Sequence, residues 1–177
     1  MKQFYSEGIK YSCKKAVTLS LFVVSTVIFY GQNVSVTASS GTATGSYPNI
    51  SAAFTNINNG THKDVITITV VNDCVEPNPP IALQATGTGS SSYTSVSIVP
   101  SGNRVVTGTP SANRSLIELF GADYVTIDGD DPNTAGGRNL TFQVPTSYST
   151  STAAIHIGSV SATNPASFIN IRNCIIK

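Results

Sequence analysis

The stretch Leu116–Gly129, LIELFGADYVTIDG, decides the fold. It holds two short apolar runs, Leu116–Phe120 and Tyr124–Ile127, that are separated only by Gly-Ala-Asp. An Asp-Gly pair follows the second run. Strands this short, rich in β-branched residues and joined by tight turns, are typical of a parallel β-helix, in which each rung stacks on the next. The sequence therefore predicts an all-β fold of this kind.

Short apolar runs recur along the chain, separated by the turn-forming residues Gly, Ser, Thr, Asn and Pro. The clearest is Val65–Val71, VITITVV, in which Ile and Val alternate with Thr as in a half-buried strand. Only one segment has a helical period, which argues against alternating βαβ units. An antiparallel β-sandwich also has short, closely spaced strands and is the alternative to the favoured β-helix. The other runs are Ile81–Leu83, Val96–Val99, Val105–Val106, Leu140–Val144, Ala154–Ile157 and Phe168–Ile171.

Two repeat registers fit the chain. In the first, Ile68, Ile98, Ile127 and Ile157 fall 30, 29 and 30 residues apart. The second places LIELFGADYVTIDG over AIHIGSVSATNPASFINIRNC, with a longer excursion between the two runs. We favour the second register because it matches paired runs rather than single triplets, and either one implies rungs of two or three strands with variable loops.

Before the strands comes one helical segment. Its apolar positions follow the i, i+3, i+4, i+7 spacing of a helix face: Ile50, Ala53, Phe54 and Ile57. Asn58-Asn59-Gly60 closes it. So short a helix is unstable alone and is expected to cover the open end of the stack. The predicted organisation is an extended lead-in at 32–46, a capping helix and turn at 47–63, and the first rungs of the β-helix at 64–177.

The N-terminus has the pattern of a secretory signal peptide over residues 1–31. Four Lys precede an uncharged apolar run, Ala16–Tyr30. This run is shorter than the roughly 20 residues that a transmembrane helix needs, although an uncleaved anchor is the alternative. We expect cleavage after Gly31, which leaves Gln32 as the new N-terminus and no transmembrane segment in the mature chain. The predicted location is secreted, extracellular or on the outer cell surface.

Removal of residues 1–31 changes the charge of the chain. It takes away four of the ten Lys and Arg residues and one of the nine Asp and Glu residues. Six basic and eight acidic residues remain, so the mature protein is weakly acidic. It lacks the basic stripe of a nucleic-acid-binding protein, and nucleic acid is not an expected partner.

Two cysteines, Cys74 and Cys174, remain after processing. An oxidising compartment would permit a disulfide. However, the two residues lie a hundred positions apart, and a stacked coil brings only neighbouring rungs within bonding range. We expect two separately buried thiols.

The one dense acidic cluster is the weak calcium candidate. Asp128, Asp130 and Asp131, with Asn133 nearby, could offer hard oxygen ligands to Ca²⁺. The distal bidentate Glu of an EF-type loop is missing. We therefore favour an ordinary turn and a solvated loop, and we expect no other cofactor.

The sequence assigns no catalytic residue. Asp123 and Asp128 flank a four-residue strand, too long for a retaining glycosidase pair unless the loops bend. Arg138 is the nearest candidate base for elimination on an acidic sugar, and it could equally pair with a carboxylate of its own loop. His62, expected in a polar turn, and His156, in a strand, do not form a ligand set.

A resemblance adds to this interpretation. SYPNISAAFTNINNGTHKDVITITV, followed by LIELFGADYVTIDG and RNLTF, resembles the N-terminal part of large secreted bacterial surface proteins. Those proteins have a pectin-lyase-like, right-handed parallel β-helix and are common in gliding Gram-negative bacteria. The resemblance covers residues 32–177 and implies a short helix that caps the first rung. Because the chain stops at Lys177 around a predicted strand, it also implies the front end of a longer protein.

Two functions remain open. The first is a secreted or cell-surface structural or adhesive module, non-catalytic, that binds polysaccharide or neighbouring surface components through its lateral faces and loops. The alternative is the N-terminal fragment of a polysaccharide lyase or glycoside hydrolase whose active site lies beyond residue 177. An enzymatic activity is the less expected of the two for this segment.

Overall fold

The structure is a computed structural model that describes residues 31–134, 136–145 and 152–177. The chain forms a parallel β-solenoid of about 3 turns with one short helix. This confirms the predicted parallel β-helix and excludes the β-sandwich. The predicted signal peptide lies almost entirely outside the described residues.

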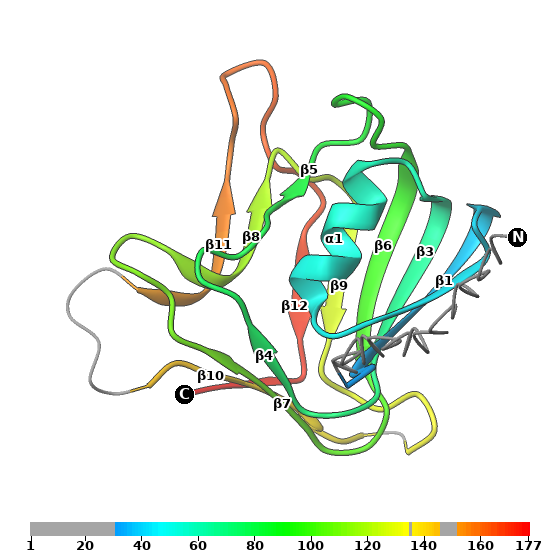
Figure 1. The fold of residues 1–177 in the computed structure, drawn as a ribbon. Coiled ribbons are helices and arrows are strands. Elements are labelled where there is room, and N and C mark those ends of the chain that lie inside the picture. The colour runs from blue at the N-terminus through cyan, green and yellow to red at the C-terminus, as the bar shows by residue number, and fades with distance from the viewer. Residues whose placement is uncertain (1–30, 135, 146–151) are drawn as a thin grey trace, which may run out of the picture.

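Thirteen strands and one helix make up the described part (Figure 1). In chain order they are β1 (Val34–Gly41), β2 (Thr44–Tyr47), α1 (Ile50–Asn58), β3 (His62–Val70), β4 (Cys74–Glu76), β5 (Leu83–Gln84), β6 (Tyr93–Pro100), β7 (Arg104–Gly108), β8 (Ser115–Phe120), β9 (Val125–Asp128), β10 (Leu140–Gln143), β11 (Ala153–Gly158), β12 (Asn170–Arg172) and β13 (Cys174–Ile176).

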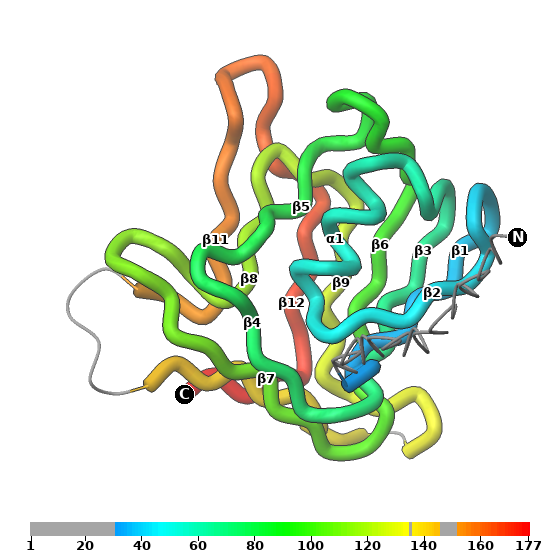
Figure 2. Tube along the Cα trace, in the orientation of Figure 1, coloured from blue at the N-terminus to red at the C-terminus, as the bar shows by residue number. Residues whose placement is uncertain are grey.

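Each turn of the solenoid adds one strand to each of three sheets. The first turn is β3–β4–β5, the second β6–β7–β8 and the third β9–β10–β11, after which β12 and β13 begin another. Strands of successive turns pair in parallel throughout the three sheets. In Figure 2 the strands β3, β6, β9 and β12 lie side by side in this order, one from each successive turn.

The core is built from columns of inward-facing aliphatic side chains. Ile68 pairs with Ile98, and Ile98 with Ile127, and all three are fully buried. The next member of this column is Ile171, not Ile157, which instead lies opposite Leu119. The favoured register, which placed the two runs of Leu116–Gly129 over the last two runs of the chain, is therefore confirmed. The 30-residue register is wrong at its last step.

Helix α1 lies between β3 and the segment that carries β4 and β5 (Figure 1). Ile50, Phe54 and Ile57 of the predicted apolar face are buried. Asn49 caps the first turn, where its side chain accepts a hydrogen bond from the Ala52 amide at 2.9 Å. The helix therefore covers the first turn of the core.

The start of α1 is also held by a carboxylate from the first turn of the solenoid. Glu76 in β4 is buried, and its two oxygens accept hydrogen bonds from the amides of Ile50 and Ser51, each at 2.9 Å. These amides are among those that a helix leaves unpaired at its N-terminus. No local sequence pattern marks Glu76 for this role, because Ile50 and Ser51 lie 26 and 25 residues before it.

The predicted lead-in forms a hairpin. Strands β1 and β2 pair antiparallel, and β1 also pairs antiparallel with β3. Val34 and Val36 of β1 are buried in the core. The hairpin thus closes one edge of the six-stranded sheet, whose order is β12-β9-β6-β3-β1-β2.

The opposite edge of the stack is open in the described part of the chain. Strands β11, β12 and β13 are the last members of their three sheets. Ile157, Ile171 and Ile176 on these strands are exposed. Beside them lies an apolar groove of about 530 Å³, lined by Val144, Ala154, Ile155, Ile171 and Ile176 among others.

Cys74 and Cys174 are free thiols, as expected, but only Cys74 is buried as predicted. Cys74 begins β4 and Cys174 begins β13, at the two ends of a four-stranded sheet of order β13-β10-β7-β4. Three strand spacings of about 4.8 Å lie between them, more than a disulfide can span. Cys74 is buried, whereas Cys174 is only partly buried against the core.

Candidate functional site

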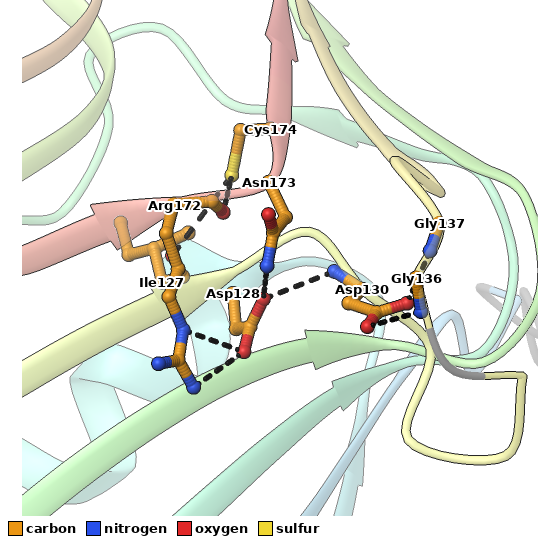
Figure 3. Close-up of polar contacts among 8 residues, drawn as sticks. All are labelled: Ile127, Asp128, Asp130, Gly136, Gly137, Arg172, Asn173 and Cys174. Atoms are coloured by element: carbon orange, nitrogen blue, oxygen red, sulfur yellow. Dashed lines mark hydrogen bonds and ion pairs between the residues drawn. The ribbon is translucent and has the colours of Figure 1, made fainter.

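The acidic cluster of the sequence braces a corner between turns (Figure 3). Asp128 ends β9, and Arg172 ends the neighbouring β12. The Arg172 Nε atom donates to Asp128 Oδ2 at 2.8 Å, and the two groups form an ion pair at 2.7 Å. Asp128 Oδ1 accepts hydrogen bonds from the Asn173 side chain at 2.9 Å and from the Asp130 amide at 3.1 Å.

Asp130 and Asp131 point at backbone amides of the loops around them. Asp130 accepts from the amides of Gly136 and Gly137, at 2.8 and 2.7 Å (Figure 3). Asp131 accepts from the amide of Gly102 at 2.8 Å, so it ties this loop to the preceding turn. It also accepts from the amide and side chain of Asn133.

These hydrogen bonds favour the charged forms of Asp128 and Asp131 without a cation. Burial by itself raises the pKa of Asp128, but donors from Asn173, Asp130 and Arg172 outweigh it and hold the pKa below its usual value. Hydrogen bonds from the Asn133 and Gly102 amides lower the pKa of Asp131. Among the described residues, no group of three or more His, Cys, Asp and Glu side chains is placed to hold a metal ion. The geometry is that of a braced loop, and calcium binding stays a hypothesis.

The other two residues considered for sugar cleavage, Asp123 and Arg138, lie in different surroundings. Asp123 accepts hydrogen bonds from the amide, at 2.9 Å, and the hydroxyl of Ser167 on the next turn. Arg138 lines a polar groove of about 460 Å³ together with Arg104 and Asp73, among others. The carboxylate of Asp73 in that groove accepts a hydrogen bond from the Val105 amide at 2.9 Å.

His62 is not in a polar turn but begins β3 and is fully buried, which corrects the sequence-based expectation. Its Nδ1 atom lies 2.6 Å from the carbonyl oxygen of Thr42, and its Nε2 atom 2.6 Å from the Tyr47 hydroxyl. Both ring nitrogens therefore have partners, and the histidine fastens the hairpin to β3. His156 is exposed on β11, with its ring edge-on to Phe120 at 5.2 Å.

The outer face of the six-stranded sheet carries a feature that sequence reasoning missed. Register places Thr37 beside Thr67, Thr67 beside Ser97, Ser97 beside Thr126, and Thr126 beside Asn170. These five residues, here called the polar row, cross β1, β3, β6, β9 and β12. On β3, β6 and β9 both neighbours of the row's member are buried in the core, so the row points outward.

The side chains of the polar row are accessible to solvent. Thr37 and Asn170 are exposed, and the other three side chains are partly exposed. Across residues 31–134, 136–145 and 152–177, none of the side-chain hydrogen bonds uses a member of the row. The charged pair nearest to it, Asp128 and Arg172, is neutralised within itself. The alternation of Thr67 and Thr69 with Ile was visible in the sequence, but their alignment with three other strands required the register.

The comparisons with known proteins give no match: no family model matches the chain, and neither does a curated protein or a solved structure. Within the described residues, none of the helical segments is long and apolar enough to cross a bilayer.

Proposed function

We propose that this chain is a non-catalytic structural or adhesive module of a secreted or surface protein, and that it binds polysaccharide through its lateral face. The polar row is the observation that carries the proposal. Five side chains that can donate and accept hydrogen bonds stand in line on a rigid solenoid, with no internal partners among the described residues.

The spacing of the row suits a repeating ligand. Neighbouring strands lie about 4.8 Å apart, so the row presents hydrogen-bonding groups at regular intervals along the solenoid axis. A polysaccharide presents hydroxyl groups repeatedly along its own length. Many weak contacts made at once give avidity that a single contact would not supply.

The surroundings of the carboxylates support a non-catalytic role. Glycoside hydrolysis needs two carboxylates on either side of one bond, about 5–10 Å apart, with one of them available as an acid. Asp123 and Asp128 each accept hydrogen bonds from residues of the next turn instead. At Asp128 such bonds hold the pKa below its usual value, which opposes its use as an acid.

Binding to polysaccharides tests the proposal. The chain is mixed with cellulose, chitin, curdlan and polygalacturonate, and both depletion from solution and release of reducing ends are measured. We expect depletion by at least one polymer, without release of ends, and a loss of depletion when the row is altered by Thr67→Val with Thr126→Val. Thr109→Val, in an exposed loop after β7, is the matched control and should bind like the wild type.

Failure to bind any of the polymers would overturn the adhesive function, and release of reducing ends would overturn the non-catalytic one. Equal binding by the Thr67→Val, Thr126→Val variant would remove the polar row from the proposal.

Export is the second part of the proposal, and it rests on the basic flank and the apolar run before residue 31. The mature protein should begin at or near Gln32. N-terminal sequencing of protein recovered from the culture medium checks this, and an intact Met1 there would contradict it.

A further inference from the structure

Two aromatic side chains stack on the surface beside the polar row. Tyr124 and Phe168 lie on neighbouring turns, with ring centroids 4.6 Å apart and ring planes at 3° to each other. Both remain exposed, Tyr124 by 52% and Phe168 by 70%. Because the rings stack face to face, each covers one face of the other, and this pair, here called the platform, leaves its ring edges and an outer ring face exposed.

The backbone at both positions is in the left-handed region. Tyr124 has a φ of 55° and Phe168 a φ of 54°. This conformation suits Gly and Asn and is costly for bulky residues. Neither ring is buried in the core, so core packing does not account for an aromatic residue there. Strain retained at an exposed position points to a function outside the fold.

The two rings lie just before β9 and β12, the last two strands that contribute to the polar row. Tyr124 precedes Thr126 by two residues, and Phe168 precedes Asn170 by two. Both rings thus belong to the same two neighbouring turns as Thr126 and Asn170. A ligand that stacks on the rings therefore has hydrogen-bonding partners within reach on the same two turns.

We propose that Tyr124 and Phe168 form a stacking subsite for a pyranose unit of a neutral polysaccharide. The side chains of Thr126 and Asn170 form hydrogen bonds with the hydroxyl groups of the sugar. This inference rests on the proposed polysaccharide binding and names where and how it occurs. The face of an aromatic ring is electronegative and attracts the C–H face of a sugar. Arg172, two residues after Asn170 on β12, is paired with Asp128 and so is not free to bind an acidic sugar, which favours a neutral one.

The chain has no tryptophan, which makes a direct probe possible. Phe168→Trp keeps an aromatic ring and places a single indole on the platform. Titration with cello-, chito- and laminari-oligosaccharides should shift or quench its fluorescence, as stacking of a sugar on the indole does. An emission spectrum that no oligosaccharide changes, from a variant that still binds the polymer, would overturn the subsite.

Loss of the rings is the complementary test. Tyr124→Asn with Phe168→Asn removes both rings and suits the left-handed backbone, so the variant should fold. We expect at least a tenfold loss of affinity for the neutral polymer. The matched control Val75→Asn, which removes an exposed apolar side chain from β4 in another sheet, should bind like the wild type.

The outcomes separate this inference from the proposed function. A wild-type chain that binds no polymer defeats both. A wild type that binds, with an unchanged Tyr124→Asn, Phe168→Asn variant, defeats the subsite alone. Selective binding of polygalacturonate that survives loss of the rings also defeats the subsite and directs attention to the groove of Arg104 and Arg138.

Discussion

Several acidic side chains of this protein accept hydrogen bonds from backbone amides. Asp128, Asp130, Asp131 and Glu76 each accept at least one hydrogen bond from a main-chain N–H group. The donors are often distant in sequence: Gly102 lies 29 residues from Asp131, and Ile50 lies 26 residues from Glu76. The sequence showed the carboxylates as a cluster, but their donors could not be found without the stacking of the turns.

Removal of the Glu76 carboxylate should destabilise the helix cap. Glu76→Ala leaves the amides of Ile50 and Ser51 without their acceptor in a buried place. Each buried unpaired polar group costs about 1–3 kcal/mol, so we expect a loss of at least 1 kcal/mol in the free energy of unfolding. Urea denaturation measures this loss. Glu118→Ala, which removes a second buried carboxylate that lies away from α1, is measured for comparison. A loss below about 0.5 kcal/mol would show that Glu76 does not anchor the helix.

Calcium should leave the stability of the chain unchanged, because the oxygens of Asp130 and Asp131 are already occupied by N–H donors. Asp130→Asn with Asp131→Asn should lower the melting temperature equally with calcium and with chelator. A true site at hundredfold excess of ligand would add about 2.7 kcal/mol. A calcium-dependent rise of roughly 2–8 °C, abolished by the double substitution, would therefore establish the metal site.

At the scale of elements, the sequence predicted the helix and the strands whose burial pattern repeats along their own residues. The helix was visible because Ile50, Phe54 and Ile57 repeat with its period, and all three are buried. The strand Val65–Val71 was visible because its apolar residues alternate with Thr. The hairpin β1–β2 was not predicted as a pair of strands, since its small polar residues have little alternation, and its pairing depends on β3.

Helix α1 should contribute strongly to stability through Phe54, a large side chain that is only 1% exposed. Phe54→Ala should lower the free energy of unfolding by about 3–5 kcal/mol, the usual result of emptying a core aromatic site. Thr55→Ala, on the exposed side of the same helix, should change it by less than about 0.5 kcal/mol. Denaturant unfolding checks both, and a loss below about 1 kcal/mol for Phe54→Ala would mean that the helix does not cover the core.

At the scale of the whole molecule, the repeat was harder to predict because its length varies. The column Ile68, Ile98, Ile127 advances by 30 and 29 residues, but the next member, Ile171, is 44 residues on. The loops of the third turn are longer, so a fixed period fails there. The core constrains the strands but not the lengths of the loops between them. A register that matches pairs of strands therefore tolerates such insertions, and it predicted the stacking correctly.

The open edge of the solenoid has a consequence for solution behaviour. Strands β11, β12 and β13 have unpaired outer edges in the described part of the chain, and Ile176 is 56% exposed beside an apolar groove of about 530 Å³. Free strand edges with exposed apolar side chains are templates for pairing with another chain. We therefore expect the 177-residue protein to self-associate as its concentration rises.

Charge at this edge should suppress the association. Ile171→Lys with Ile176→Lys places two cations where a second chain would pack, and desolvating them opposes pairing. Val75→Lys, an equally exposed position on β4, adds charge away from the edge and should leave association unchanged. Sedimentation velocity across a range of concentrations measures the effect. A wild type that stays monomeric throughout, or association that the edge lysines do not reduce, would show that the exposed turn is not an adhesive surface.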